Sequence, residues 1–169
     1  MTDHLELKGY GKINLGLDVV RKREDGYHEV RMIMQTVSLY DKIVMDKSGR
    51  QGIWTETNLP YVPDGEGNLA YRAAKLLLDE FQISEGVKIR IKKCIPVAAG
   101  MAGGSTDAAA VLVGINRMFD LGLKKRELMA RGLKLGADVP YCILRGTALS
   151  EGIGEVLTEL PAAPGCHVV

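Results

Sequence analysis

The segment Pro96-Val97-Ala98-Ala99-Gly100-Met101-Ala102-Gly103-Gly104-Ser105-Thr106 combines small residues, two adjacent hydroxyl side chains and the start of a helical run. Apart from Met101, every residue from Ala98 to Gly104 is glycine or alanine. Small residues let backbone N–H groups approach a ligand that a larger side chain would hold away. The segment is therefore typical of a loop that cradles an anion such as a nucleotide phosphate.

The residues after this loop predict a helix from Ser105 to about Phe119. Asp107-Ala108-Ala109-Ala110-Val111-Leu112 has strong helix propensity, and the hydroxyls of Ser105 and Thr106 favour N-capping. A helix N-terminus presents unpaired N–H donors and partial positive charge, and both attract a phosphate. The alternative is a glycine-rich turn that serves only close packing.

Two common phosphate loops are excluded by spacing. A Walker A loop has a lysine before its final Ser or Thr, and Gly104 stands there instead. The dinucleotide fingerprint requires G-x-G-x-x-G, whereas the glycines here are at 100, 103 and 104.

Composition indicates a globular chain that binds small molecules. With 169 residues, 46% hydrophobic and 25% charged, it can bury a core as one domain, and two lobes are also compatible with this length. A net charge of +1 gives no broad attraction for nucleic acid or an acidic membrane. The sequence contains no apolar run of membrane-spanning length, and its start lacks the features of a signal peptide, so we expect a cytoplasmic protein. The isolated Cys94, Cys142 and Cys166 are interpreted as reduced thiols.

The rest of the chain predicts an α+β fold. Alternating, partly β-branched segments indicate strands at 13–19, 30–37, 42–45 and 87–91, and short strands within 146–160. A turn at 24–26 joins the first two. Helices are expected after Asn68, which would cap the run 69–78, and from 125 to 135. This order favours a largely antiparallel sheet with helices on one face.

Two charged residues outside the loop are candidates for catalysis. Lys12 lies between Gly11 and Ile13 near the start of a strand, and Asp138 precedes Val139 and Pro140. A solvated lysine and a turn aspartate are the ordinary readings of these patterns. The alternative is a cation and a carboxylate held in a cleft.

Together these segments resemble the GHMP kinase superfamily, which includes galactokinase, homoserine kinase, mevalonate kinase and phosphomevalonate kinase. Its ATP loop follows P-x-x-x-G-[LM]-x-[GS]-S-[ST], and residues 96–106 match when one extra glycine is allowed. Gly11-Lys12-Ile13-Asn14-Leu15, Asp25-Gly26-Tyr27-His28 and Gly136-Ala137-Asp138-Val139-Pro140 look like the branch that acts on a cytidine-diphosphate-linked sugar alcohol in non-mevalonate isoprenoid synthesis.

The resemblance implies the fold of the superfamily's amino-terminal domain, of the ribosomal protein S5 domain 2-like type, over residues 1–160. It also implies that 161–169 begin a carboxy-terminal domain whose absence would leave the chain weakly active or inactive alone. The implied activity is transfer of the γ-phosphoryl group of ATP to a substrate hydroxyl with the help of Mg²⁺, which suits a reaction that depends on positioning and charge stabilisation.

Residue roles follow from the same resemblance. Lys12 and Asp138 would be catalytic, the aspartate accepting the hydroxyl proton and the lysine keeping it ionised. Residues 96–106 would bind ATP, with the Ser105 and Thr106 hydroxyls reaching phosphate oxygens or, for Ser105, Mg²⁺. Asn68 would lie near the adenine. Tyr27 and His28 would bind the substrate at its cytosine, and Asn14 would bind and orient the same substrate or orient Asp138.

Two other functions stay open. A homoserine- or mevalonate-type kinase of the same superfamily shares the ATP loop, but its substrate has no base for the segment 25–28 to read. A non-catalytic RNA-binding module of similar fold would need a basic surface, which the near-neutral charge does not supply.

Overall fold

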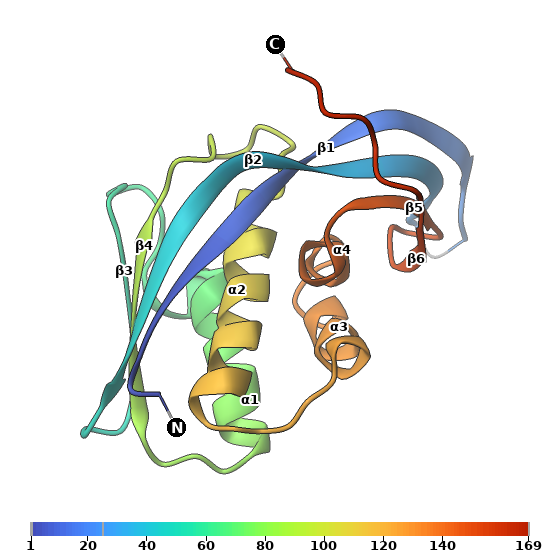
Figure 1. Ribbon diagram of the computed structural model, residues 1–169. Coiled ribbons are helices and arrows are strands. Elements are labelled where there is room, and N and C mark those ends of the chain that lie inside the picture. Colours follow the sequence, from blue (N-terminus) through green and yellow to red (C-terminus); the bar gives the residue numbers. More distant parts are fainter. Residues whose placement is uncertain (1, 25, 169) are drawn as a thin grey trace.

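The sheet is built around one long strand. The computed structural model describes residues 2–24 and 26–168, so Asp25 of the expected turn lies outside the described residues. Strand β2 (His28–Ser48) pairs with β1 (His4–Lys22) along one edge. Its other edge pairs with β4 (Gly86–Lys92) near one end and with β5 (Thr147–Glu151) near the other. Figure 1 shows β1 and β2 arching together over the helices.

Two short strands complete the sheet. β3 (Ile53–Thr57) lies beside β4, and β6 (Val156–Glu159) lies beside β5. The pair β3 and β4 is parallel, and the other described strand pairs are antiparallel. The prediction of a largely antiparallel sheet is confirmed.

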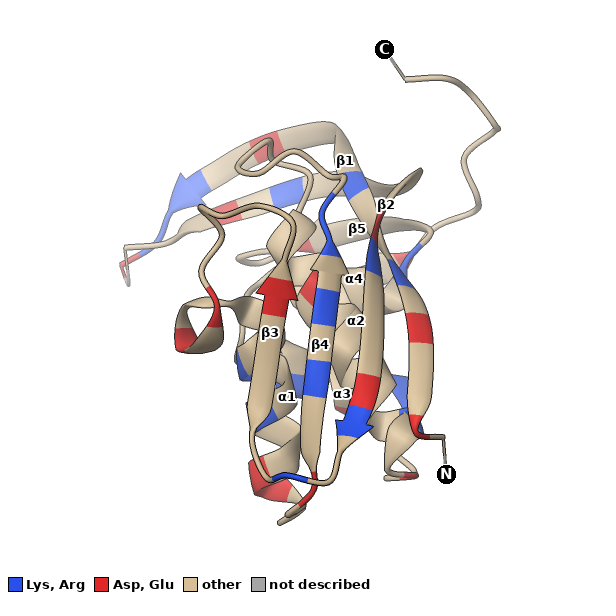
Figure 2. Ribbon diagram, turned by 90° about the vertical axis from the view of Figure 1, so that its left-hand side faces the viewer, with Lys and Arg blue, Asp and Glu red and all other residues tan. Residues whose placement is uncertain are grey.

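The helices cover one face of this sheet, as predicted. They are α1 (Leu69–Glu80), α2 (Gly103–Met118), α3 (Lys125–Leu133) and α4 (Val139–Leu144), with a 3-10 turn η1 (Gly65–Gly67) before α1. Figure 2 shows β3, β4 and β2 side by side in front of the helices, with basic bands on the outward face of β4. Strand alternation explains the two faces, since Val87, Ile89 and Ile91 point into the core and the intervening basic residues point outward. Among the described residues, no helix is both long and apolar enough to cross a membrane.

Several predicted elements have different limits in the structure. The separate strands expected at 30–37 and 42–45 are one continuous strand, β2, because β1 pairs with it on both sides of an irregularity at 37–39. The helix expected at 125–135 ends at Leu133. A further helix, α4, follows it, with a proline in its first turn, where the missing N–H removes no helical hydrogen bond. Asn68 caps α1 as expected, its Oδ1 accepting from the Ala70 N–H.

The expected N-cap of α2 is wrong. The helix begins two residues earlier, at Gly103, and its N-cap is Ala102 in the left-handed conformation at φ 58°, with no side-chain cap. Ser105 and Thr106 therefore lie inside the first turn. The Thr106 N–H makes the first helical hydrogen bond, to the Ala102 carbonyl, at 2.8 Å.

Gly114 marks the closest approach of α2 to the sheet. A Cβ placed on it would lie 2.3 Å from Met45 Sδ and 2.9 Å from Leu7 Cδ1. We expect Gly114→Ala to lower the free energy of unfolding by about 1–3 kcal/mol through overpacking, measured by urea denaturation. The matched control is Gly104→Ala in the same helix, where the nearest atom, Leu69 Cδ1, is at an ordinary 3.5 Å. If both substitutions have equal effects, packing at Gly114 is not the cause.

Candidate active site

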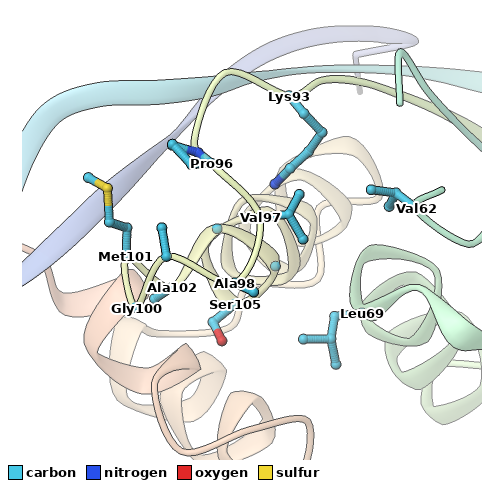
Figure 3. A pocket seen from close by; sticks show the side chains of 13 residues that line it. Val62, Leu69, Lys93, Pro96, Val97, Ala98, Gly100, Met101, Ala102 and Ser105 are labelled. Atoms are coloured by element: carbon cyan, nitrogen blue, oxygen red, sulfur yellow. The ribbon is translucent and has the colours of Figure 1, made fainter. Parts of the chain in front are cut away.

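The small-residue loop lines a pocket of about 290 Å³. Every residue from Pro96 to Ser105 contributes to its wall, and Val62, Leu69 and Lys93 complete it. In Figure 3, Val62 and Leu69 lie across the pocket from Met101 and Ala102, and Lys93 reaches in from the end of β4. The pocket thus has an apolar wall and a backbone wall, a combination suited to an anionic ligand with an apolar part, and the Lys93 ammonium at its edge is already paired with two carboxylates.

The loop backbone turns through three left-handed residues. Ala98, Gly100 and Ala102 have φ values of 59°, 71° and 58°. This conformation is unfavourable for alanine, so the surrounding contacts hold the loop in a fixed shape. The chain then enters α2 at Gly103, where the first N–H groups of the helix have no partner within it. The loop and the helix N-terminus together line a pocket that is suited to a phosphate.

Lys12, Asn14 and Asp138 meet beside the loop. The Lys12 Nζ lies 3.9 Å from Asp138 Oδ2 and donates to Asn14 Oδ1 at 3.1 Å. Lys12 is 5% exposed, and the Asp138 side chain is 33% exposed. Asp138 stands at the N-cap of α4 but makes no side-chain cap bond, so its carboxylate is not engaged there. A buried cation therefore faces a carboxylate that solvent or a substrate can reach.

The position of Asp138 is fixed through Tyr141. The buried Tyr141 hydroxyl donates to the Gly146 carbonyl at 2.6 Å and lies 3.1 Å from Thr36 Oγ1. Burial raises the pKa of Tyr141 to about 12, so its proton stays available for this bond. Thr36 is the β2 partner of Lys12 in the strand register. The same point of the sheet thus anchors both Lys12 and the helix that carries Asp138.

Two hydrogen bonds join the loop to β1. The Lys12 N–H donates to the Met101 carbonyl at 3.1 Å, and the Thr106 hydroxyl donates to the Tyr10 carbonyl at 2.8 Å. Thr106 is buried, and its hydroxyl is occupied by this bond instead of lining the pocket. Ser105 lines the pocket. The adjacent strand residues thus fix the distance between the loop and Lys12.

Three other predicted site residues lie outside this group. Both polar ends of the Asn68 side chain are used, Oδ1 by the Ala70 N–H and Nδ2 by the Pro63 carbonyl, and its neighbour Leu69 lines the pocket instead. Tyr27 and His28 are exposed at the far end of the β1–β2 hairpin. The strand contour from His28 to Thr36, which pairs with Lys12, is about 26 Å at roughly 3.3 Å per residue. Only an extended ligand reaches both places.

A buried ionic network under the loop was missed by the sequence analysis. Lys93 Nζ donates to Asp41 Oδ2 at 2.5 Å and to Asp107 Oδ2 at 2.7 Å. Burial opposes the charge of Lys93, but the two carboxylates together raise its pKa. Burial raises the pKa of Asp107 to about 7 although Lys93 opposes the shift. Within the part of the chain that the structure describes, Asp107 Oδ1 has no hydrogen-bond partner.

Strand alternation carries a signal for part of this network. Lys93 continues the inward-facing series that includes Ile89 and Ile91, and Asp41 shares the inward parity of Ile43 and Met45. A charged residue on a core-facing position is costly unless it is paired.

Metal-binding clusters and reactive thiols would be alternative kinds of site in the described residues. No group of three or more His, Cys, Asp or Glu side chains within residues 2–24 and 26–168 is arranged to hold a metal. The cysteines are free, as predicted, and burial raises the pKa of Cys142 to about 12, which keeps that thiol protonated.

Comparison with known proteins assigns the fold. Residues 68–146 match the family model described as the GHMP kinases N terminal domain. A crystal structure of 4-(cytidine 5'-diphospho)-2C-methyl-D-erythritol kinase is similar at 40% identity and a TM-score of 0.79, over 92% of this chain and 55% of that one. Mevalonate kinase of Methanococcus jannaschii has the same fold at 16% identity and a TM-score of 0.73. The chain has the fold of a GHMP kinase N-terminal domain.

Two relatives of higher sequence identity share the name of one particular kinase. A protein of Lachnoclostridium phytofermentans named 4-diphosphocytidyl-2-C-methyl-D-erythritol kinase is 59% identical over 98% of this chain. A protein of the same name from Lachnospira eligens is 53% identical over 99% of it. The chain spans 57% and 58% of the length of these two relatives.

The raised pKa of Asp107 predicts a pH-dependent stability. Between its ordinary value of 3.8 and about 7, the folded protein retains a proton that the unfolded chain releases. The free energy of unfolding contributed by this group therefore falls as pH rises through that window and is constant above it. We expect Asp107→Asn to remove this slope, measured by urea denaturation from pH 4 to 8. The exposed Asp64→Asn is the control and should leave the slope as in the wild type. A slope unchanged in Asp107→Asn would contradict the assignment.

Proposed function

We propose that this domain binds ATP and supplies the catalytic residues for transfer of its γ-phosphoryl group to a hydroxyl of 4-diphosphocytidyl-2-C-methyl-D-erythritol. The observation that carries the proposal is the hydrogen bond between the Lys12 N–H and the Met101 carbonyl. It fixes the Lys12–Asp138 pair next to the loop, so that one rigid unit contains both an anion pocket and an acid–base pair. The names of the relatives support the choice of acceptor.

In the proposed reaction, the loop N–H groups and the α2 N-terminus hold the ATP phosphates. The substrate hydroxyl oxygen attacks the γ-phosphorus, the bond from that phosphorus to the β-γ bridging oxygen breaks, and ADP leaves. Asp138 accepts the hydroxyl proton, and the nearby Lys12 ammonium offsets negative charge that develops on the transferring group.

Mg²⁺ fits this site as a partner of the nucleotide. The ion keeps several waters and is commonly held by phosphates with one or two protein oxygens, so it needs no protein cage. The Ser105 hydroxyl, which lines the pocket, is the proposed protein ligand. When bound, Mg²⁺ would neutralise phosphate charge.

The acceptor would extend from Asp138 along the hairpin. We assign Asn14 to orienting the acceptor or Lys12, because its Oδ1 accepts from the Lys12 Nζ. Tyr27, with 60% of its surface exposed, offers a stacking face for cytosine, and His28 lies next to it. With ATP as donor, we place the reaction in the cytoplasm, with a small-molecule acceptor and no nucleic acid partner.

A homoserine- or mevalonate-type acceptor is the second candidate, favoured only by the fold that mevalonate kinase and homoserine kinase share with this chain. A panel of the three acceptors, assayed with a protein that carries this domain at the full length of the named relatives, distinguishes them. A preference for homoserine or mevalonate would overturn the proposed acceptor.

ATP binding at the loop is tested by Gly104→Asp. An acidic residue in the first turn of a helix is stabilising, so the fold should be retained while the carboxylate repels phosphate. We expect ATP affinity, measured by calorimetric titration with Mg²⁺, to fall at least about 10-fold. The neutral Gly104→Asn is the matched control and should lose less. Equal affinity in both variants and the wild type would refute phosphate binding here.

The base assignment is tested by Asp138→Asn in a protein that carries this domain at the full length of the named relatives. We expect turnover to fall about 10²–10⁴-fold because general-base help is lost, with ATP affinity unchanged. Initial rates of ADP release measure turnover, and the exposed Asp64→Asn serves as the control. Turnover near that of the wild type would refute Asp138 as the base.

A further inference from the structure

We propose that Asp41 is a positioning residue for the anion loop. Its carboxylate holds residues 93–95, which lead into the loop, against the sheet, and through Lys93 it links them to the start of α2. The inference deepens the proposed function, since it rests on the loop as the ATP site. It concerns residues that lie outside the predicted catalytic and substrate-binding sets.

The ladder of hydrogen bonds between β2 and β4 ends just before the loop. Register pairing runs from Ser48 opposite Gly86 to Lys42 opposite Lys92 and then stops. The next residues of the β4 chain, Lys93 to Ile95, lead into the loop and leave backbone N–H groups without strand partners. Buried N–H groups need an acceptor.

Asp41, the next residue along β2, supplies that acceptor. Its Oδ1 accepts from the Cys94 N–H at 2.5 Å and from the Ile95 N–H at 2.8 Å. Its Oδ2 accepts from Lys93 Nζ at 2.5 Å. With an exposed surface of 0%, Asp41 makes these three bonds without competition from water.

An ion pair connects the two ends of the loop. Lys93 stands just before the loop and Asp107 just after it, and their charged groups lie 2.7 Å apart. A Cβ on Gly103 would lie 3.2 Å from Lys93 Nζ, so the ammonium also lies against the first residue of α2. The Lys93 ammonium thus connects the chain before the loop with Asp107 after it, and Asp41 connects this ammonium to β2.

A purely stabilising role does not account for this choice of residues. Burying an ion pair costs desolvation that its attraction often only offsets, and apolar replacements of similar volume are commonly as stable. Directional bonds to two consecutive N–H groups define a backbone path that an apolar side chain cannot define. The geometry therefore assigns Asp41 to the shape of the loop.

The test compares two Asp41 variants with Asp46→Asn. Asp46 is the matched control because it lies on the same strand and is also ion-paired, to Arg90, but at the surface. Asp41→Ala removes all three bonds. Asp41→Asn keeps the Oδ1 acceptor for Cys94 and Ile95 while losing the charge that faces Lys93. Amide hydrogen exchange is followed in the nucleotide-free protein, and ATP affinity is measured on the same samples.

In Asp41→Ala we expect exchange of the Cys94 and Ile95 amides, which lose their acceptor, to quicken at least about 10-fold, while Ile43 and Ile89 stay within about 3-fold of the wild type. Asp41→Asn should show a smaller change confined to the same two amides, and it carries the test if the alanine variant does not fold. ATP affinity should fall in the same order as the protection of these amides. Wild-type exchange at Cys94 and Ile95, or quickening that is equal there and in the core, would overturn the proposal. Because exchange is measured without nucleotide, a wild type that fails to bind ATP would refute the proposed function and leave this result readable.

Discussion

The buried carboxylate of Asp41 is the point at which the sheet, the loop and helix α2 are joined. It accepts hydrogen bonds from the Cys94 and Ile95 N–H groups, which have no partner strand after β4 ends. It also pairs with the Lys93 ammonium, which donates a second hydrogen bond to Asp107. Such a charge is tolerated inside a protein only when its hydrogen bonds are met. The arrangement therefore fixes where the loop begins before any ligand is bound.

Strand β1 connects the loop and helix α2 with Lys12, which faces Asp138. Gly9 packs so closely on α2 that an added Cβ would lie 3.2 Å from the backbone oxygen of Thr106. Three residues further along β1, Lys12 is bonded to the loop through its N–H and faces Asp138 with its side chain. A phosphate in the loop and a proton acceptor at Asp138 would be held in register by this one strand. Such positioning is what phosphoryl transfer most requires from a protein.

How far the site was predictable depends on the range of the interactions involved. Asn68 was predicted as a cap because capping involves residues two apart in sequence. The N-cap of α2 was predicted wrongly because the Thr106 hydroxyl donates its hydrogen bond to the Tyr10 carbonyl, 96 residues away in sequence. Lys93 and Asp41 could have been suspected from their inward strand parity, but nothing local indicates that they pair with each other.

By itself, the sequence determined the α+β class, the loop at 96–106 and the identity of Lys12 and Asp138 as candidates, because small-residue turns, periodicity and short motifs are local features. Tertiary structure alone decided that β2 is one continuous strand, and it brings the Lys12 ammonium to 3.9 Å from the Asp138 carboxylate, a proximity that the resemblance implied. It also decided that Thr106 faces the strand and not the pocket. These outcomes depend on contacts between residues far apart in the chain, whose energies no local pattern contains.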